Sequence, residues 1–308
     1  MLFIIIPGIL FFYVSARIGY KRTSYHLPNE VSPYKGIDGE RVRPYRDLCL
    51  SLTDAMCAKE FEDIYTKAYD GTPLRARFFR GRDERAPFVI MFHGYRSMPL
   101  RDFAGINRKP AELGYNIIMV DHRAHGKSGG HTISFGGKES RDAVRWAKYV
   151  AERFGSDVKI ILLGISMGGA TVISASAKKE LPSSVCGIVA DCPFSSAKGI
   201  IIKVMKDLEL PVGFLYPFVR LGSMIFGGYD PSRVDIALAA KKTNLPILLI
   251  HGVKDSFVPH AMSEKIAEAP TVEFHSFPDG EHGTCYLSDP ERYERLTEEF
   301  MTRVISQK

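Results

Sequence analysis

The sequence predicts an α/β fold, a mostly parallel eight-stranded sheet flanked by helices. Two observations predict it: short, continuously apolar runs recur along the chain, and segments of helical length separate most of them. Strands that are apolar on both faces indicate a parallel sheet that is covered by helices on both sides. The expected strands include 88–92, 116–120, 158–163, 185–190, 246–250 and 272–277, and the clearest expected helices are 139–154 and 167–180.

An antiparallel hairpin is expected before these runs. Residues 61–80 alternate apolar and polar side chains on both sides of Asp70 and Gly71, a pair that is typical of tight turns between strands. Residues 21–60 differ, because they contain several prolines and no sustained period. We therefore expect a linker with a short helix near 47–59, followed by one α/β domain over 61–308.

One interval is too long for a plain connection between two strands. Residues 193–243 separate two expected strands, and the middle of this stretch, 210–226, is rich in Phe, Leu, Met and Ile. We expect an inserted lid of short helices over the carboxyl ends of the strands, lining a site for an apolar group. The candidate lining residues are Ile165, Phe194, Phe214 and Phe218.

The first 20 residues form a distinct apolar segment. No charge occurs from Leu2 to Val14, and Arg17, Lys21 and Arg22 follow. A membrane span needs about 20 residues, so the segment is marginal, and Arg17 would have to reach the interface. Basic residues on the C-terminal flank predict an anchor that leaves the rest of the chain facing the cytoplasm. The alternatives are a buried or interfacial helix, a cleaved signal, and a soluble cytoplasmic protein.

Composition argues against several classes of function. The net charge is +6, but Lys and Arg are scattered rather than grouped with aromatic residues, so nucleic acid is not an expected partner. The five cysteines form no C-x-x-C pair and suit neither a disulfide framework nor a zinc site. Reduced thiols favour a cytosol-facing location. No metal-binding or dinucleotide motif occurs, so neither a metal nor a cofactor is expected.

The stretch GISMGG at 164–169 joins an expected strand to an expected helix. Gly164 and Gly168 lie two residues before and two residues after Ser166. A nucleophile elbow requires this order, because the chain turns sharply at the serine and small neighbours let the strand and helix pass closely. The alternative is a glycine-rich turn with an incidental serine, and the motif alone does not decide between the two.

A nucleophilic serine requires a base, and the base requires an orienting acid. Asp255 follows the expected strand 246–250, and His282 lies in a loop after the last strand, in the order serine, acid, histidine. Other residues compete for both roles. The alternatives are Asp191 and Glu281 for the acid, and His251, His260 and His275 for the base.

Acyl transfer also needs donors for the oxyanion. We expect the backbone amide of Met167, directly after the serine, and that of Tyr95, in the HGY loop after the strand 88–92. His93 in the same loop is expected to bind loop backbone. Residues 121–130 lack the glycine order of a phosphate-binding loop, so we expect a turn that packs against these loops.

These stretches together resemble the α/β-hydrolase superfamily from about Phe61 to the C-terminus. The matching segments are HGY, DHRAHGKSGG, GISMGG, GVKDSFVP and GEHG. More narrowly, DHRAHGKSGG, ADCPF, GGYDPSRV and the apolar N-terminus resemble membrane-associated bacterial serine hydrolases of the YqkD type, which are similar to prolyl-oligopeptidase catalytic domains. Ala124 departs from the glycine that many relatives have in this turn. The resemblance implies a triad of Ser166, Asp255 and His282, with the amides of Tyr95 and Met167 as oxyanion donors.

The sequence therefore predicts a serine hydrolase that cleaves carboxylic esters with an apolar acyl or aryl group through an acyl-enzyme. The expected partner is a small ester or lipid-like substrate. A peptidase or amidase of the prolyl-oligopeptidase kind is the alternative, because a triad does not encode the leaving group. A membrane-tethered binding protein that kept the fold without turnover is the third hypothesis.

Overall fold

The computed structural model describes the backbone of residues 2–307 and the side chains of residues 10–307. Eight strands form one sheet in the order β1-β2-β4-β3-β5-β6-β7-β8. Only β2 pairs antiparallel, with β1 and β4, and the other neighbours are parallel. The predicted α/β architecture is confirmed. The strands are β1 (Glu62–Lys67), β2 (Pro73–Phe79), β3 (Phe88–Phe92), β4 (Asn116–Asp121), β5 (Ile160–Ile165), β6 (Val185–Asp191), β7 (Ile247–Gly252) and β8 (Val272–Phe277).

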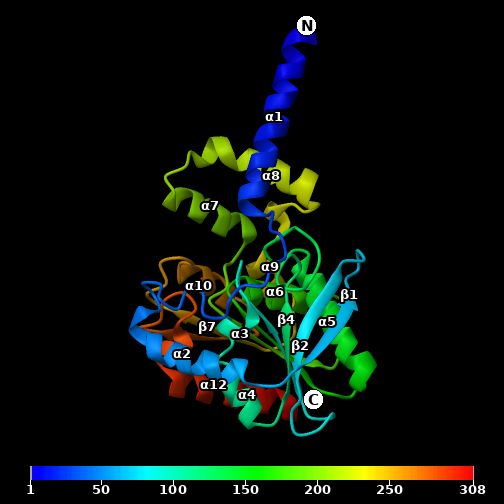
Figure 1. Cartoon of the computed structure of the whole chain (residues 1–308), viewed down its shortest axis with the longest axis vertical. Helices are drawn as coiled ribbons and strands as arrows, with labels where there is room; N and C mark the ends of the chain where they lie inside the picture. The colour runs from blue at the N-terminus through cyan, green and yellow to red at the C-terminus, as the bar shows by residue number, and fades with distance from the viewer. Residues whose placement is uncertain (1, 308) are drawn as a thin grey trace.

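Helices cover both faces of the sheet (Figure 1). Successive strand residues point to opposite faces, so Ile90 of β3 packs into one core and its neighbour Met91 into the other. One face is covered by α5 (Glu139–Phe154), α6 (Met167–Ser176), α9 (Ile236–Ala240) and α10 (Ala261–Ala267). The other is covered by α2 (Arg46–Cys57), α4 (Arg108–Glu112) and α12 (Pro290–Ser306). Shorter pieces are η1 (Arg43–Tyr45), α3 (Pro99–Asp102), η2 (Pro231–Arg233) and α11 (Cys285–Ser288).

The central strands end at one edge of the sheet. Ile165 of β5 is in register with Asp191 of β6, and Asp191 is in register with Ile250 of β7. Because these strands are parallel, the loops that follow them leave the sheet side by side. Residues far apart in the sequence therefore meet at this edge.

Three helices form a cap that stands above the sheet in Figure 1. They are α1 (Leu2–Thr23), α7 (Ala197–Asp207) and α8 (Val212–Gly227). Two glycines let α1 and α8 approach closely: a Cβ atom at Gly222 would lie 1.9 Å from the Ala16 carbonyl oxygen, and one at Gly19 would lie 2.9 Å from Val219 Cα. The first half of α1 continues beyond this contact and projects away from the body (Figure 1).

Buried hydroxyl groups fix the lower end of α1. Tyr20 Oη lies 2.7 Å from Thr132 Oγ1, and Ser24 Oγ lies 2.7 Å from Tyr229 Oη. Hydrogen bonds between buried groups are directional, so these pairs set the position of the helix end. Residues 10–24 are thus an integral part of the cap.

No helix in the described part of the chain is long and apolar enough to cross a membrane. The apolar run predicted as an anchor lies in α1. Residue 1 and the side chains of residues 2–9, which belong to the same prediction, lie outside what the structure describes.

Candidate active site

Ser166 stands at the turn between β5 and α6 in a strained conformation. Its φ is 54° and its ψ is −115°, a combination that non-glycine residues rarely adopt. The turn depends on both flanking glycines. A Cβ at Gly168 would lie 1.7 Å from the Phe92 carbonyl oxygen, and one at Gly164 would lie 2.2 Å from the carbonyl carbon of Gly168.

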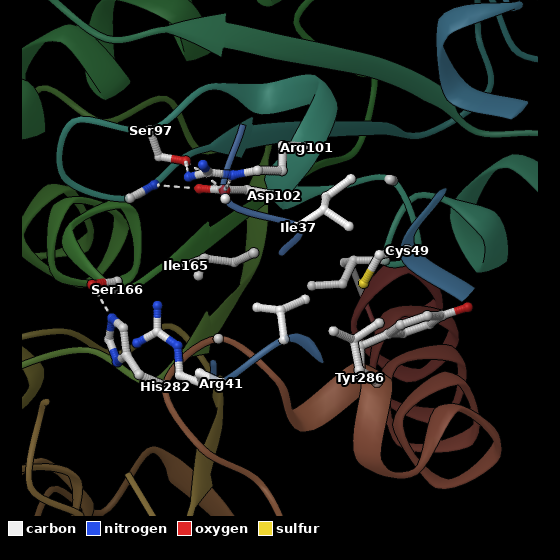
Figure 2. A pocket seen from close by; sticks show the side chains of 18 of the residues that line it. Ile37, Arg41, Cys49, Ser97, Arg101, Asp102, Ile165, Ser166, His282 and Tyr286 are labelled. Atoms are coloured by element: carbon white, nitrogen blue, oxygen red, sulfur yellow. Dashed lines mark hydrogen bonds and ion pairs between the residues drawn. The ribbon is translucent and has the colours of Figure 1, made fainter. Parts of the chain in front are cut away.

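The structure brings Ser166, His282 and Asp255 into one chain of hydrogen bonds. His282 Nε2 lies 2.9 Å from Ser166 Oγ, and His282 Nδ1 lies 2.7 Å from Asp255 Oδ2. Figure 2 shows the first of these contacts. The geometry fits a neutral imidazole whose Nδ1 donates to the carboxylate and whose Nε2 accepts from the hydroxyl. That tautomer is able to take the hydroxyl proton.

The Asp255 carboxylate is buried and accepts four hydrogen bonds. Oδ1 accepts from the amides of Phe257 and Val258 at 2.9 and 2.7 Å, and Oδ2 accepts from His251 Nε2 at 3.0 Å as well as from His282. Burial by itself raises the pKa of this carboxyl, but the hydrogen bonds from His251 and His282 outweigh it and hold the pKa well below its usual range. Asp255 is therefore an anion that can stabilise a charged His282.

His251 contributes to this arrangement in a way that the sequence did not predict. Its ring is buried, its Nδ1 lies 2.6 Å from Ser263 Oγ, and its Nε2 is shared between Asp255 and the Val258 carbonyl oxygen at 2.9 Å. The sequence indicated this residue only as an alternative base. The available signal was its position at the end of a strand, four residues before the acid.

The remaining alternative bases lie elsewhere. His260 Nε2 contacts Ser276 Oγ at 2.9 Å, and His275 Nε2 contacts Glu273 at 2.9 Å. Glu281, considered for the acid, gives its backbone amide to Thr284 Oγ1. None of these three contacts involves Ser166 or His282.

Asp191, the other alternative acid, has a different environment. Its backbone carbonyl oxygen accepts the Ser166 amide at 2.7 Å, whereas its side chain is buried beside Cys192, Cys285 and Tyr293. Burial raises the pKa of this carboxyl to about 6. Its backbone, rather than its carboxyl group, contacts the nucleophile.

The loop after β3 lies against Ser166. A Cβ at Gly94 would be 3.6 Å from Ser166 Cβ. The Gly94 amide donates to Asp102 Oδ2 at 2.9 Å, and the Arg96 amide donates to His125 Nε2 at 3.1 Å. Both neighbours of Tyr95 are thereby held, and His125 shows that the turn 121–130 packs against this loop as predicted.

His93 also holds this loop. Its Nδ1 donates to the Gly94 carbonyl oxygen at 2.8 Å, and its Nε2 accepts from the His122 amide at 3.1 Å, so it binds loop backbone as predicted. Burial lowers the pKa of His93, which keeps the ring neutral and able to accept. The amide of Met167 opens α6 and has no acceptor within the helix. This amide and that of Tyr95 are the oxyanion donors that the sequence predicts.

Two cavities meet at Ser166. The first, of about 390 Å³, lies between residues 36–53, the loop after β3 and Tyr286 (Figure 2). The second, of about 630 Å³, lies under the cap formed by α1, α7 and α8. Both are lined in part by segments that the sequence presents as an anchor and a linker, and nothing in those segments signals a site.

The predicted lining residues divide between these cavities. Ile165 lines the first, and Phe194 and Phe218 line the second. The structure corrects the expectation for Phe214, which lines neither cavity and is 60% exposed. Phe214 lies one turn before Phe218 on the same side of α8, and its ring packs against that of Phe218 with the ring centroids 5.5 Å apart, outside the cavity lining.

Among the side chains of residues 10–307, Cys192, Asp255 and His282 are the group whose geometry comes nearest to a metal site. Their ligand atoms lie within 4.8 Å of one another. However, Asp255 and His282 already bond each other, and burial raises the pKa of the Cys192 thiol well above its usual value. A protonated thiol is a poor metal ligand, so these residues do not fit a metal centre.

Comparisons with known proteins support the fold. The family model for the alpha/beta hydrolase fold matches residues 87–223. YqkD of Bacillus subtilis is 27% identical over 193 residues, which cover 62% of this chain and 63% of YqkD. The alpha/beta hydrolase domain-containing protein WAV2 of Arabidopsis thaliana is 26% identical over 83% of each chain. Among solved structures, an esterase of Pyrococcus furiosus has a TM-score of 0.68 at 24% identity and covers 92% of this chain and 99% of its own.

Proposed function

Because the chain belongs to the α/β-hydrolase superfamily, we propose that it is a serine esterase that cleaves carboxylic esters with an apolar acyl or aryl group. One observation carries the proposal: the continuous chain of hydrogen bonds from Ser166 through His282 to Asp255. The esterase of Pyrococcus furiosus that shares the fold supports it.

In this mechanism Ser166 Oγ attacks the ester carbonyl carbon while His282 Nε2 takes the hydroxyl proton. The negative charge that forms on the carbonyl oxygen is stabilised by the amides of Met167 and Tyr95. Collapse of the intermediate breaks the ester bond, and His282 returns the proton to the departing alcohol. Water then attacks the acyl-enzyme by the same route, and Asp255 stabilises the charged imidazole in each half.

The cavity under the cap supports an apolar acyl group. Its walls include Phe194, Ile200, Val204, Phe218 and Val219, and burial of each methylene group of a chain against such walls contributes about 0.8 kcal/mol. A cavity of about 630 Å³ lies within the usual range for small-molecule sites. We expect esters of medium-length acids to be better substrates than acetates.

The deciding experiment is Ser166→Ala, measured by p-nitrophenyl ester hydrolysis and by fluorophosphonate labelling. Both should be abolished, because Ser166 Oγ supplies the attacking group in this mechanism. Ser174→Ala, on the same helix, is the matched control and should retain both. Activity or labelling that survives in Ser166→Ala would contradict the mechanism, and faster cleavage of short peptides than of esters would favour a peptidase.

A change at the contact between α1 and α8 tests whether the cavity under the cap binds the acyl group. Leucine at Gly222 would overlap the Ala16 backbone and displace α1, whereas a Cβ at Gly213 of the same helix meets nothing within 4 Å. We expect Gly222→Leu to lower kcat/KM for dodecanoyl esters by about tenfold, as about two methylene contacts are lost, and to affect acetate esters less. Gly213→Leu should behave as wild type. If Gly222→Leu lowered kcat/KM equally for dodecanoyl and acetate esters, we would conclude that α1 does not line the acyl site.

We further propose that the cap binds an anionic lipid surface on the cytoplasmic side. Exposed apolar side chains cluster on its outer part, and Arg17, Lys21 and Arg22 lie on the same helix. An apolar face beside basic residues is typical of interfacial helices. The exposed apolar residues are Leu10, Phe11, Phe12, Tyr13, Val14 and Ile18 of α1, and Phe214, Met224 and Ile225 of α8.

Sedimentation with vesicles of phosphatidylcholine and phosphatidylglycerol tests this surface. The double variant Leu10→Ser/Phe214→Ser should bind the vesicles at least about tenfold more weakly, because it replaces two apolar side chains that would be buried among the lipids. Tyr65→Ser, which removes an equally exposed side chain from β1, should bind as wild type. Equal binding by the double variant and the wild type would refute the proposal.

A further inference from the structure

The two cavities at Ser166 differ in the charges that line them. The smaller cavity contains two arginines, Arg41 and Arg101, and a single acid, Asp102, among its described lining residues. It also borders His282, which becomes positive during the proposed reaction. The lining of the smaller cavity therefore carries a net positive charge beside His282, which gains a further positive charge during the proposed reaction.

Arg101 and Asp102 neutralise each other and hold the wall of the cavity. Arg101 Nε lies 3.3 Å from Asp102 Oδ1, and its Nη1 and Nη2 donate to the Lys35 carbonyl oxygen at 2.8 Å and to Ser97 Oγ at 2.5 Å. Asp102 in turn accepts the Gly94 amide. This pair ties Lys35 to the loop after β3, and each nitrogen of the Arg101 guanidinium already donates to one partner.

Arg41 is the cation without such partners. Among the residues that the structure describes, its side chain forms no ion pair and no hydrogen bond, although Asp38 and Asp47 on the same segment both pair with Arg46. Figure 2 shows its guanidinium pointing into the cavity on the side of His282. A cation held beside a catalytic imidazole disfavours imidazolium formation unless an anion compensates it.

We infer that the substrate carries a negatively charged phosphate or carboxylate on the alcohol side of its ester, and that Arg41 binds this group. The inference rests on the proposed esterase function. The guanidinium presents a planar set of donors that matches either oxyanion. The acyl chain then enters the apolar cavity under the cap, and the anionic alcohol part occupies the smaller cavity, with the ester carbonyl at Ser166 between them.

The larger cavity also has arginines at its rim, but their surroundings differ. Arg96 donates to the Tyr25 carbonyl oxygen at 3.2 Å and lies over the Tyr95 ring. Arg22 is in the last turn of α1, where a cation is stabilised by the helix dipole. Neither borders His282, so we place the anion at Arg41.

Three dodecanoyl esters with one acyl chain test the inference: 1-dodecanoylglycerol, its 3-phosphate, and O-dodecanoyl lactate, each assayed as monomers in the absence of lipid. The measured quantity is the ratio of kcat/KM for each anionic ester to that for the neutral one. We expect a ratio of about ten in the wild type for at least one anion, as one charge-assisted contact provides. The anionic ester that gives this ratio identifies whether the group bound by Arg41 is a phosphate or a carboxylate.

Variants then locate the anion. Arg41→Gln should bring the ratio to about one, mainly through KM, and Arg41→Glu should reverse the preference. Arg43→Gln, a nearby exposed arginine outside the cavity lining, is the matched control and should keep the wild-type ratio. The wild-type ratio should also fall as salt is raised, because Arg41 is exposed and its charge is screened.

Several outcomes would overturn the inference. They are a wild-type ratio near one for both anions, an unchanged ratio in Arg41→Gln, and a ratio lost in Arg22→Gln instead, which would place the anion under the cap. Failure of the esterase proposal is distinguishable, because no ester would be cleaved and Ser166 would not be labelled by fluorophosphonate. Labelling and cleavage of the neutral ester without any anionic preference would refute the inference alone.

Discussion

Two buried aspartates lie at the same edge of the sheet, Asp191 as the last residue of β6 and Asp255 in the loop after β7, yet their surroundings affect the carboxyl group in opposite ways. Asp255, after β7, accepts two backbone amides and two imidazole donors, and its pKa lies well below the usual range. Asp191, at the end of β6, is packed beside thiols and a phenol, and burial raises its pKa to about 6. Burial is common to both carboxyl groups, so it does not determine the charge.

The number and type of donors that face each carboxyl group account for this difference. After β7 the chain turns so that the amides of Phe257 and Val258 point back at Asp255. At the end of β6, the Asp191 carbonyl oxygen instead accepts the Ser166 amide. The loop after β7 therefore holds an anion for His282, and the end of β6 positions the backbone of the nucleophile.

The largest expected effect separates the two acids by rate. Asp255→Asn should lower kcat for p-nitrophenyl butyrate by roughly 10⁴-fold, because an amide in this place favours the wrong tautomer of the histidine. Asp191→Asn should lower kcat less than about tenfold, since its side chain does not contact His282. Circular dichroism would verify that both variants fold. Similar losses of kcat in the two variants would show that the two carboxyl groups do not differ in their contribution to catalysis.

The second expected effect distinguishes Asp191 from Asp255 by the pH dependence of the free energy of unfolding. Because the pKa of Asp191 is raised from 3.8 to about 6, the folded state holds this proton more tightly, and stability is lost as pH rises between these values. Asp191→Asn removes the ionisable group, so the variant does not lose this stability as pH rises. Its free energy of unfolding, relative to wild type, should increase by about 2 to 3 kcal/mol between pH 4 and pH 7, at 1.36 kcal/mol per pKa unit.

Urea unfolding at the two pH values measures this change. Asp279→Asn is the matched control, because Asp279 is an exposed acid that pairs with Lys254, and exposed pairs contribute about 0 to 1 kcal/mol. A difference between Asp191→Asn and wild type that does not vary with pH would show that the Asp191 carboxyl has the same pKa in the folded and unfolded chains.

The smallest effect concerns the donor from His251. His251→Phe removes one hydrogen bond to Asp255, so the pKa of Asp255 should rise and the acid should be protonated earlier as pH falls. We expect kcat to decrease about tenfold, the value of one hydrogen bond to a charged group, with a loss that grows toward acid pH. His251→Gln, which can still donate, should recover part of the rate. A uniform loss at every pH in both variants would indicate packing alone.

Much of the fold follows from short-range patterns in the sequence. The apolar runs became β3 to β7 because a strand that is buried on both faces must be largely apolar, whereas β8, at the edge of the sheet, is half-buried and carries Glu273 and His275. Gly164 and Gly168 marked the turn at Ser166 for a similar reason, since any side chain there would overlap backbone atoms. The order of Ser166, Asp255 and His282 predicted which loops would meet, because parallel strands end at one edge.

The choice between the acids and the shape of the site were decided by tertiary structure. Asp191 and Asp255 both follow an apolar run in the sequence, and only the path of the chain after β7 directs donors toward Asp255. The sequence likewise shows an apolar N-terminal segment and a linker, whereas the folded chain uses residues 15–23 and 36–53 as walls of the two cavities. Contacts of this kind join residues far apart in the chain, and they depend on the close approach of whole helices and loops, which local composition does not encode.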